Sequence, residues 1–337
     1  MNWKITKKTK ITIITLIFLI SQVSQTMKIN TQIKSGRLQK MKTFYKDLPV
    51  LVTGGAGFIG SHIVEKLVTL GAKVTIIDDL SSGNIQNLKN LKGKIKFICK
   101  SIVNMDACLK ATKNQAVIFH LAAFISVPES MENPTLCHQV NVDGTFNILQ
   151  AARINGVKKL VFSSSAAIYG PTELVCKENM TPNPQSPYGT TKLMGEYYCK
   201  QFANNFGLKT ITLRYFNVFG QRQNPNGAYG AVVAKFTDLM GKNKPVTIFG
   251  DGLQTRDFIP VQDVVEANLT VAMLESKFMN GQAFNIGTGK SISLLELVAL
   301  LKKDFPKYNK EMQFKPARTG DIKHSSADCS KYQSLEI

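Results

Sequence analysis

Apolar and polar positions alternate along the chain in blocks of changing period. Residues 49–53 form a continuous apolar run, residues 58–69 repeat apolar side chains at helical spacing, and residues 73–77 form a second apolar run. Short continuous runs are typical of strands that are buried on both faces, and a helix between two of them predicts a βαβ unit. The fold is therefore expected to begin with strand, helix and strand.

The same alternation continues to about residue 215. Further strands are expected near 95–98, 116–120, 159–163 and 210–214, and helices near 134–154 and 187–206. Strands that alternate with helices favour a parallel sheet with helices on both faces. The predicted fold class is α/β, a Rossmann-type doubly wound parallel sheet.

Beyond about residue 215 the pattern loosens into loops rich in Gly, Pro and Asn, such as "FGQRQNPNGAYG". A helix at 230–241 and short strands around 246–249 and 283–286 predict a smaller C-terminal α/β lobe, partly interleaved with the first domain. The expected organisation is an N-terminal extension outside the fold (residues 1–46), a Rossmann domain (47–215) and a region that mostly forms the smaller lobe (216–337).

The N-terminal extension carries a basic segment, "MNWKITKKTK", followed by a ten-residue apolar run, "ITIITLIFLI". This run is too short to span a bilayer and is close in length to the apolar region of a signal peptide. The cleavage-site signal in "SQVSQTMK" is poor, and from Met41 onward the chain reads like an ordinary start. Two interpretations stay open: an over-extended start, or a leader that brings residues 1–26 to a membrane.

The charge of the chain is concentrated at its beginning. Residues 1–48 hold ten Lys/Arg and one acid, Asp47, so nine of the nineteen net positive charges lie there. The remainder has no clusters of Arg with aromatic residues, so nucleic-acid binding is not expected, and a basic surface suits a small anionic substrate. The six cysteines show no C-x-x-C or Cys/His spacing, so no metal site is expected and the thiols are interpreted as reduced, in a cytoplasmic protein.

A glycine-rich turn follows the first strand. "VLVTGGAGFIGSH" places Gly54, Gly57 and Gly60 where the strand turns into the helix. Glycine permits the tight bend and the close approach of a pyrophosphate to backbone amides at the helix N-terminus. Asp78 ends the second strand 18 residues after Gly60, where a carboxylate would accept from both ribose hydroxyls and repel a 2′-phosphate. The turn predicts NAD binding rather than NADP binding; the alternative is a packing loop with a capping Asp.

A second motif carries candidate catalytic groups. In "SPYGTTK", Pro187 suits the first turn of a helix, so Tyr188 and Lys192 stand one turn apart on the same face. The Lys192 ammonium and the positive nicotinamide ring of bound NAD are expected to lower the pKa of Tyr188 toward the range of a general base. Upstream, "KLVFSSSAAIYG" is a buried strand that ends in serines, and the Ser165 hydroxyl is expected to hold a substrate oxygen against Tyr188.

Taken in order, these motifs resemble the extended short-chain dehydrogenase/reductases, specifically the NAD-dependent UDP-sugar 4-epimerases that act on UDP-glucose or UDP-N-acetylglucosamine. The similarity runs from about residue 48 to 330 and includes "HLAA", "NVDGTFNIL", "RYFNVFGQRQNP", "DGLQTRDFIPVQDV" and "RTGDIKHSSAD". It implies that Tyr188 takes the proton from the sugar 4-hydroxyl while the C4 hydride passes to NAD. The 4-keto sugar then turns over and the hydride returns to its other face, with Ser165 on the 4-oxygen and Lys192 on the nicotinamide ribose.

The resemblance also implies two sets of binding residues. NAD would be bound by Gly54, Gly57, Phe58, Ile59, Gly60, Asp78, Ile102, Leu121, Ala122, Ala123, Lys192 and Tyr215. The UDP-sugar would be bound by Ser126, Asn217, Arg256, Arg318, Asp321 and Ser325. Two arginines facing a diphosphate make chemical sense. The alternative for Arg256 and Arg318 is an ion pair at the surface or between domains.

Four positions bear on the branch of the family. Related dehydratases and decarboxylases carry acids where this chain has Ala166 and Ala167, so elimination and decarboxylation lose their acid/base group and epimerisation is favoured. In 4-epimerases of this family a large Tyr at the position of Ser325 closes the pocket against an N-acetyl group, so the smaller Ser325 favours UDP-hexosamines as substrates. Ile125, in place of the lysine of galactose-type enzymes, favours the same substrates. The alternatives are another UDP-sugar enzyme, such as a UDP-glucuronate 4-epimerase, and a non-catalytic NAD-binding protein.

Some positions depart from the family. Ser101 stands where most relatives have an Asp that contacts adenine, Pro260 replaces a usual aromatic residue, and relatives continue beyond the position of Ile337. These departures imply weaker cofactor binding and a substrate lobe that is truncated at its end. Relatives commonly form homodimers through a four-helix contact, which here would use the helices near 134–154 and 187–206.

Overall fold

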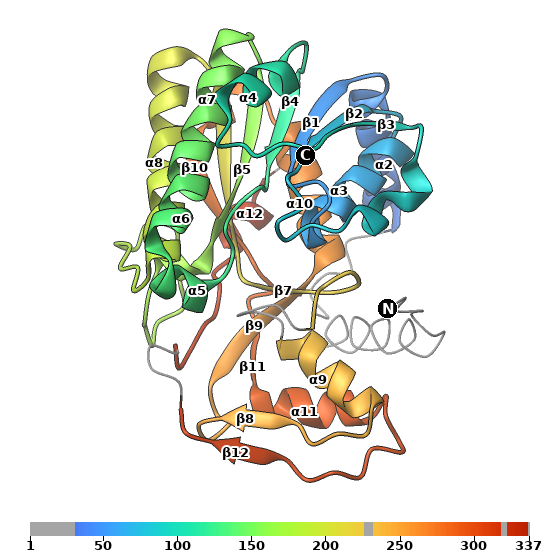
Figure 1. The fold of residues 1–337 in the computed structure, drawn as a ribbon, viewed down its shortest axis with the longest axis vertical. Helices are drawn as coiled ribbons and strands as arrows, with labels where there is room; N and C mark the ends of the chain where they lie inside the picture. The colour runs from blue at the N-terminus through green and yellow to red at the C-terminus, as the bar shows by residue number, and fades with distance from the viewer. Residues whose placement is uncertain (1–30, 226–231, 318–321, 336–337) are drawn as a thin grey trace.

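A seven-stranded sheet forms the centre of the computed structural model, which describes residues 31–225, 232–317 and 322–335 (Figure 1). All of its strand pairs are parallel, and their order is β10-β6-β5-β4-β1-β2-β3. The strands are β1 (Pro49–Thr53), β2 (Lys73–Ile77), β3 (Ile95–Ile98), β4 (Val117–His120), β5 (Lys159–Ser165), β6 (Lys209–Tyr215) and β10 (Asn280–Ile286). The Rossmann-type sheet expected from the apolar runs is confirmed.

The strand order reverses beside β1. Leu51 of β1 is paired with Thr75 of β2 on one side and with Ile118 of β4 on the other. The chain therefore leaves β1 in one direction and later returns to its opposite edge. In sheets of this kind, ligands bind outside the carboxyl ends of the strands at such a switch point.

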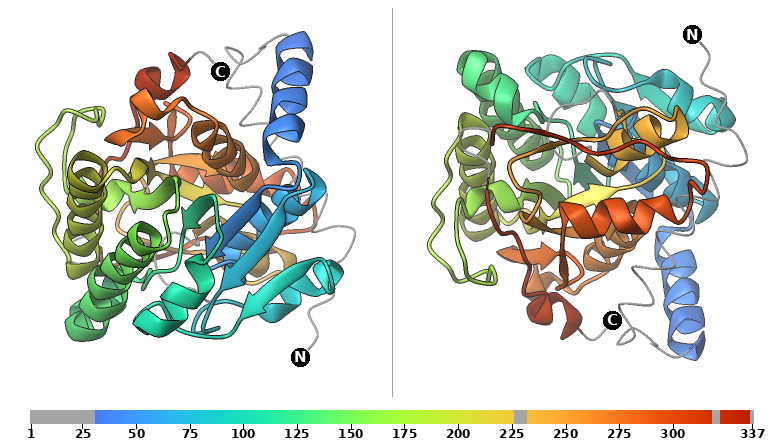
Figure 2. Two further views of the ribbon diagram at one scale, coloured as in Figure 1. Left: turned by 90° about the horizontal axis from the view of Figure 1, so that it is seen from above. Right: turned by 90° about the horizontal axis from the view of Figure 1, so that it is seen from below.

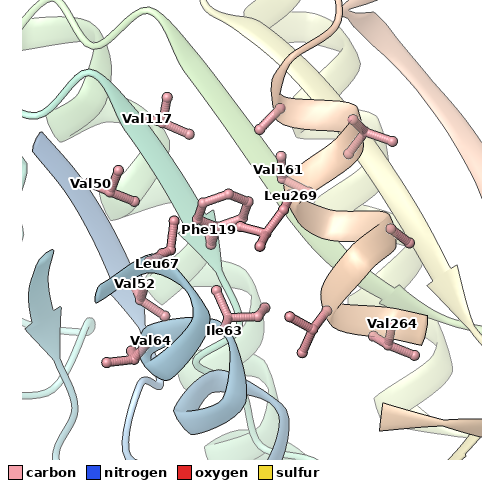
Figure 3. Packing of buried hydrophobic residues seen from close by; sticks show 14 of the residues in the cluster. Val50, Val52, Ile63, Val64, Leu67, Val117, Phe119, Val161, Val264 and Leu269 are labelled. Atoms are coloured by element: carbon pink, nitrogen blue, oxygen red, sulfur yellow. The ribbon is translucent and has the colours of Figure 1, made fainter. Parts of the chain in front are cut away.

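Helices cover both faces of the sheet. One face carries α4 (Met105–Thr112), α7 (Gly144–Ile154) and α8 (Pro187–Phe206), and the other carries α3 (Phe58–Thr69) and α10 (Val261–Ala272). Figure 3 shows the core under α3 and α10, where Phe119 of β4 lies among Ile63, Leu67 and Leu269. All four side chains are fully buried, which accounts for the continuous apolar strands in the sequence.

The helix expected near 134–154 is interrupted. The chain forms α5 (Val127–Glu132), α6 (Pro134–His138), one π-helical turn (Gln139–Asp143) and then α7. The π turn turns Asn141 inward, where its Oδ1 accepts from Phe124 N at 2.7 Å and its Nδ2 donates to Thr191 Oγ1 at 3.0 Å. This side chain ties the loop after β4 to helix α8, and π turns of this kind often occur at functional sites.

A smaller lobe lies below the sheet (Figure 1). It contains a three-stranded sheet, a two-stranded sheet and two helices around a separate apolar cluster. Its elements are β7 (Asn217–Phe219), α9 (Val232–Gly241), β8 (Thr247–Phe249), β9 (Thr255–Pro260), β11 (Ser291–Ser293), α11 (Leu294–Lys302) and β12 (Gln313–Lys315).

One strand expected in the smaller lobe belongs to the large sheet. Residues 283–286 lie in β10, and Phe284 is paired with Leu213 of β6. Helix α10 also packs on the large sheet, and it contacts β7 and β9 of the smaller lobe as well. Residues 216–337 therefore supply β10 and α10 to the Rossmann domain. The pairing of β10 with β6 is long-range and leaves no local signal in the sequence.

For residues 31–46, the structure corrects the expectation that the segment 1–46 lies outside the fold. Helix α2 (Thr31–Tyr45) lies beside α10 (Figure 2). Tyr45 is fully buried, and its hydroxyl donates to Leu269 O at 2.7 Å. Met41 is buried in the same cluster, and Arg37 pairs with Glu266 at 3.2 Å. The apolar run at 11–20 lies outside the described residues. Within the described ranges, none of the helices combines the length and the apolar character that crossing a membrane requires.

The end of the described chain packs on the same core. In helix α12 (Ser330–Gln333), Lys331 Nζ donates to Ala283 O at 2.7 Å and lies 4.7 Å from the centroid of the Phe284 ring. Tyr332 and Leu335 pack against the cluster formed by α3, α10 and the sheet. These contacts fasten residues 330–335 to strand β10.

Candidate active site

A cleft of about 1020 Å³ lies at the carboxyl ends of the central strands. Its walls come from the turn after β1, the ends of β2, β4 and β5, the first two turns of α8, and residues 222–225 after β7. Every residue predicted to bind the cofactor lines it: Gly54, Gly57, Phe58, Ile59, Gly60, Asp78, Ile102, Leu121, Ala122, Ala123, Lys192 and Tyr215. Tyr188 lines the same cleft.

The glycine turn leaves no room for side chains at two of its three positions. Gly54 has φ +68°, and a Cβ there would lie 2.7 Å from Ala122 N. A Cβ on Gly60 would lie 2.1 Å from Gly54 O, whereas one on Gly57 would meet only Gly54 O at 3.2 Å. Helix α3 begins directly after Gly57 and has no side-chain cap, so the N–H groups of its first turn remain available to an anion. The turn therefore forms a cradle that fits a pyrophosphate.

Asp78 is held by the same turn. Its two carboxylate oxygens accept from Ala56 N and Leu80 N, each at 2.8 Å. Burial raises the pKa of this carboxyl from its ordinary value, and the two backbone N–H bonds oppose the rise. Each oxygen keeps a further acceptor position, so a ribose diol fits here, as the sequence predicted for NAD.

Asp79, which the sequence reasoning did not single out, also lines the cleft. Its carboxylate accepts from Ser81 Oγ at 2.6 Å and is hydrogen-bonded to the Ser101 side chain. Burial acts to raise the pKa of this carboxyl, and the hydrogen bonds from Ser81 and Ser101 outweigh it, so the pKa is lowered. The Asp79 carboxylate therefore lies beside Ser101, the position at which the family resemblance implied an Asp.

A buried histidine fixes the loop after β4. Thr53 Oγ1 accepts from Leu121 N at 3.1 Å and from Ala122 N at 3.0 Å, so its proton is donated to His120 Nδ1 at 2.7 Å. His120 Nε2 therefore carries the ring proton and donates it to Thr145 Oγ1 at 3.0 Å. Burial, with a smaller contribution from Lys192, lowers the pKa of His120 to about 3. This network went unnoticed in the sequence, although His120 begins the "HLAA" motif.

Tyr188 and Ser165 lie together at the meeting of α8 and β5. Ser186 caps α8 by accepting from Gly189 N at 3.1 Å, and Pro187 occupies the first turn, as predicted. The Tyr188 hydroxyl is hydrogen-bonded to the Ser165 side chain, whose Oγ also accepts from Ala167 N at 3.1 Å. Burial raises the pKa of Tyr188 above its ordinary value, and the bond to Ser165 opposes the rise.

Lys192 is buried beside this pair. Its Nζ donates to Ser163 O at 2.9 Å and lies 5.9 Å from the centroid of the Tyr188 ring. Burial lowers the pKa of Lys192 to about 8. In the protein alone burial dominates the pKa of Tyr188, so the joint effect of Lys192 and the nicotinamide ring on that pKa stays a prediction.

The four predicted substrate residues that the structure describes do not line the same cleft. Ser126 is buried as the N-cap of α5, where its Oγ accepts from Glu129 N at 3.2 Å. Asn217, Arg256 and Ser325 lie around β9 in the smaller lobe: Asn217 Nδ2 donates to Asp257 O at 3.3 Å, and Ser325 N donates to Thr255 O at 3.1 Å. Arg256 is buried, with NH1 donating to Thr255 O at 2.9 Å. Arg318 and Asp321 lie outside the described residues.

The cleft has one wall that the sequence reasoning missed. Arg222 lies in the cleft wall with φ +69°, and its guanidinium forms an ion pair with Glu65 and donates to Ser61 Oγ at 3.2 Å. His62 Nε2 is hydrogen-bonded to Gln221 O at 2.9 Å. Residues 221–225, which form a strap after β7, are thereby held against α3. The quoted motif "RYFNVFGQRQNP" contained it, but nothing local indicated its partner.

Comparison with known proteins identifies the family of the chain. The family model described as "NAD dependent epimerase/dehydratase family" matches residues 50–287, which include the glycine turn, Tyr188 and Lys192. The chain belongs to this family. A family member from Methanocaldococcus jannaschii, described as a putative UDP-glucose 4-epimerase, is 42% identical over 289 residues, which span 85% of this chain and 92% of that protein.

Solved structures of the epimerase/dehydratase family agree. A UDP-N-acetylglucosamine 4-epimerase from Methanobrevibacter ruminantium, in complex with UDP-N-acetylmuramic acid, is 39% identical with a TM-score of 0.81, covering 86% of this chain and 93% of its own. A UDP-glucose 4-epimerase from Thermus thermophilus, in complex with NAD, is 34% identical with a TM-score of 0.78, covering 85% and 92%. The fold expected from the sequence is thus that of the epimerase/dehydratase family.

Proposed function

We propose that the protein catalyses NAD-dependent epimerisation at C4 of a UDP-hexose or a UDP-N-acetylhexosamine. The observation that carries this proposal is the meeting of Tyr188 and Lys192 with the glycine turn in one cleft at the switch point of the sheet, with the Ser165 side chain hydrogen-bonded to Tyr188. The names of the relatives support the same reaction. Motif and geometry therefore favour a reversible oxidation of a sugar hydroxyl.

The chain supplies the proton chemistry and the orientation. NAD bound along the glycine turn supplies a two-electron acceptor for the C4 hydrogen and a positive charge beside Tyr188. Because burial raises the pKa of Tyr188, that charge is needed to make the phenol a base near neutral pH. Tyr188 then takes the proton of the 4-hydroxyl, while Ser165 holds the 4-oxygen. The resulting 4-keto sugar turns over and receives the hydrogen on its other face.

Lys192 has a separate role in this proposal. One of its three donors is directed to the Ser163 carbonyl, which leaves two for the hydroxyls of the nicotinamide ribose. Asp78 would accept from the adenosine ribose at the other end of the cleft. These two contacts would fix the cofactor against Tyr188.

The residues after Ser165 favour epimerisation over elimination. Ala166 and Ala167 form a short 3-10 turn with Ile168 directly beyond Ser165, at the place where an acid would be needed for dehydration or decarboxylation. Epimerisation needs only a group that takes and returns the 4-hydroxyl proton, which is Tyr188, and NAD as acceptor of the C4 hydrogen. The same arrangement would serve a UDP-glucuronate 4-epimerase, so the sugar has to be determined by experiment.

We assign the UDP moiety to the smaller lobe. Arg256 and Asn217, together with Arg318 and Asp321, would bind the uridine diphosphate, and Ser126 and Ser325 would border the sugar. A serine at position 325 leaves space for an N-acetyl group, which favours UDP-N-acetylglucosamine as one substrate. All six cysteines lie in described residues and are free thiols, in keeping with a reducing compartment such as the cytoplasm.

A homodimer through α7 and α8 completes the proposal. These neighbouring helices expose large apolar side chains, and Phe146 packs on Tyr198 and Phe202 between them. The exposed members are Phe146, Ile154, Tyr197 and Phe206. An apolar surface over two adjacent helices suits a symmetric helix-to-helix contact with a second copy.

The test uses the full chain incubated with UDP-glucose and, separately, with UDP-N-acetylglucosamine, and resolves the 4-epimers by chromatography with and without added NAD. Conversion of at least one sugar is expected, and Tyr188→Phe is expected to abolish it while leaving the unfolding transition in place. The ratio of the two rates reports the sugar preference. Normal NAD binding without conversion of either sugar, or of UDP-glucuronate, would refute the proposal and favour a non-catalytic NAD-binding protein.

A further inference from the structure

Behind the candidate catalytic residues, a buried ion pair joins α8 to β6. The Arg214 guanidinium donates to Glu196 Oε2 at 2.7 Å and to Oε1 at 3.0 Å, and the two residues are only 6% and 7% exposed. Glu196 lies one turn after Lys192 and two turns after Tyr188 on α8. Buried pairs of this kind are often no better for stability than apolar residues of the same size. Stability alone is therefore a weak reason for this pair.

The Glu196 carboxylate holds β5 at the point where the strand reaches the cleft. Ser164 Oγ donates to Glu196 Oε1 at 2.5 Å. On the other face of the strand, Ser163 Oγ is hydrogen-bonded to Tyr215 OH at 3.0 Å, and the Ser163 carbonyl accepts from Lys192. The strand end is therefore fixed on both faces immediately before Ser165.

The guanidinium is positioned by groups other than Glu196. Ser164, Arg214 and Asn285 are register partners on the neighbouring strands β5, β6 and β10. Arg214 NH1 donates to Tyr169 OH at 2.9 Å, Tyr169 OH donates to Asn285 Oδ1 at 2.6 Å, and Asn285 Nδ2 donates to Asp328 O at 3.1 Å. This row sets the place of Arg214, and Arg214 in turn sets the place of the carboxylate.

Glu196 also contributes to the charge around Lys192. Burial lowers the pKa of Lys192 to about 8, and Cys137, Cys199 and Glu196 act against that decrease. Burial raises the pKa of the phenol and thiols that face Lys192, and it lowers the pKa of the imidazole, so these neighbours are neutral where Lys192 titrates: Tyr188 and Cys199 on α8, Cys137 on α6 and His120 on β4. Among the described neighbours, the charged groups are Glu196 and, behind it, Arg214 of β6.

We propose that Glu196, held by Arg214, is a positioning residue for the reaction proposed above: it fixes the strand end that carries Ser165 and places a negative charge one helical turn from the Lys192 ammonium. This inference rests on the proposed function. A neutral lysine would lose one of its donors and its positive charge, and it would bind the cofactor ribose less well. Glu196 touches neither substrate nor cofactor, and it acts through Ser164 and Lys192.

The first test measures NAD affinity against pH by calorimetry, without any sugar present. In the wild type, affinity is expected to fall as Lys192 loses its proton near pH 8, and Lys192→Met is expected to abolish this dependence. In Glu196→Gln the midpoint is expected about half a pH unit or more lower, because the stabilising charge is gone. Thr210→Val is the control, since it removes a buried hydrogen bond to Cys199 O (2.7 Å) and should keep the wild-type midpoint.

The second test removes the hydrogen bond without changing the charge. Ser164→Ala is expected to lower kcat about tenfold with little change in KM or in the NAD midpoint, because only the placement of Ser165 is affected. The double variant Glu196→Gln/Arg214→Gln leaves no unpaired buried charge and replaces Glu196→Gln if that variant does not fold.

If a folded Glu196 variant keeps the wild-type pH midpoint of NAD affinity, the effect of Glu196 on Lys192 is refuted. If Ser164→Ala keeps kcat within twofold of the wild type, the effect of Glu196 on the placement of Ser165 is refuted. The NAD curve is independent of turnover. A failure of the proposed epimerase activity would therefore leave the first test intact.

Discussion

At the scale of single residues, the glycine turn makes the sharpest demands. A Cβ on Gly60 would lie 2.1 Å from Gly54 O and 3.0 Å from Gly55 Cα, so the backbone itself would have to move. We expect Gly60→Ala to lower the free energy of unfolding by about 1–3 kcal/mol, the usual cost of overpacking, and to abolish NAD binding.

Gly57→Ala is the matched comparison for that variant. Its Cβ would meet only Gly54 O at 3.2 Å, so the fold should hold while the methyl group hinders a pyrophosphate. Calorimetric NAD titration and urea unfolding of both variants separate the two effects. Equal stability of the two alanine variants would contradict the steric interpretation.

His120 is expected to make the protein sensitive to acid. The pKa of His120 is lowered to about 3 in the folded protein, whereas an unfolded histidine titrates near its ordinary value. Between these pH values the unfolded chain binds the extra proton, so the free energy of unfolding falls as the pH falls, by about 1.4 kcal/mol per pH unit from this residue.

Urea unfolding at pH 7, 6, 5 and 4.5 measures this dependence. His120→Gln is expected to show a smaller slope than the wild type by that amount. The control His138→Gln changes an exposed histidine and should keep the wild-type slope. The same slope in His120→Gln and in the wild type would show that His120 is not the acid-sensitive group.

At the scale of elements, the sequence predicted what local pattern and spacing determine. Strands β1 and β2 and helices α3 and α8 were predicted with the bounds that the structure shows, because buried parallel strands are continuous apolar runs and because Pro187 and the glycine turn mark helix starts. In the cleft, the glycine turn, Tyr188 and Lys192 were found because their chemistry depends on spacing within one segment.

The remainder depends on partners that are distant in the sequence. The pairing of Phe284 with Leu213 moves β10 into the large sheet, and no local feature of residues 280–286 indicates it. The pair of Glu196 with Arg214 likewise requires the placement of α8 against β6. The raised pKa of Tyr188 follows from its burial, which only the folded structure gives.

The strap after β7 is expected to slow the release of the cofactor. Arg222 bridges from the cleft wall to Glu65 and Ser61 of α3, in the same cleft as the glycine turn that fits a pyrophosphate. Because exposed ion pairs contribute about 0–1 kcal/mol, Glu65→Gln should raise the rate constant of NAD dissociation up to about fivefold, with little change in unfolding free energy.

Glu266→Gln is the matched control for the strap. Glu266 pairs with Arg37 and is exposed to nearly the same extent as Glu65, at 47% against 46%, but it lies outside the cleft lining. Stopped-flow displacement of NAD by excess competitor measures the rate. Equal dissociation rates in the two variants would show that the strap does not retain the cofactor.

At the scale of the whole molecule, the apolar surface of α7 and α8 predicts the assembly. Tyr197 is 58% exposed on α8, beside the aromatic residues that pack between the two helices. A charge there would have to be desolvated in a helix-to-helix contact, so Tyr197→Lys is expected to convert the dimer to a monomer. Sedimentation equilibrium measures the mass, and Leu253→Lys, equally exposed in the smaller lobe, should remain dimeric. A monomeric wild type would contradict the proposed dimer.

Helix α2 decides where the folded unit begins. A chain that starts at Met41 keeps Phe44 and Tyr45, whereas one that starts at Asp47 loses them together with the hydrogen bond from Tyr45 to Leu269 O. Because Tyr45 is fully buried, its removal should cost about 3–5 kcal/mol, as for other large aromatic side chains. The loss of the Arg37–Glu266 pair, common to both truncations, should cost at most about 1 kcal/mol.

Urea unfolding of the two truncated chains and of the full chain therefore measures the contribution of the last turn of α2. We expect the chain that starts at Met41 to be nearly as stable as the full chain and the one that starts at Asp47 to be clearly less stable. Tyr45→Ala in the full chain should reproduce most of that loss, because the helix would remain while its buried ring is gone. If the chain that starts at Asp47 is as stable as the full chain, the Rossmann domain begins at β1, and α2 only rests on its surface.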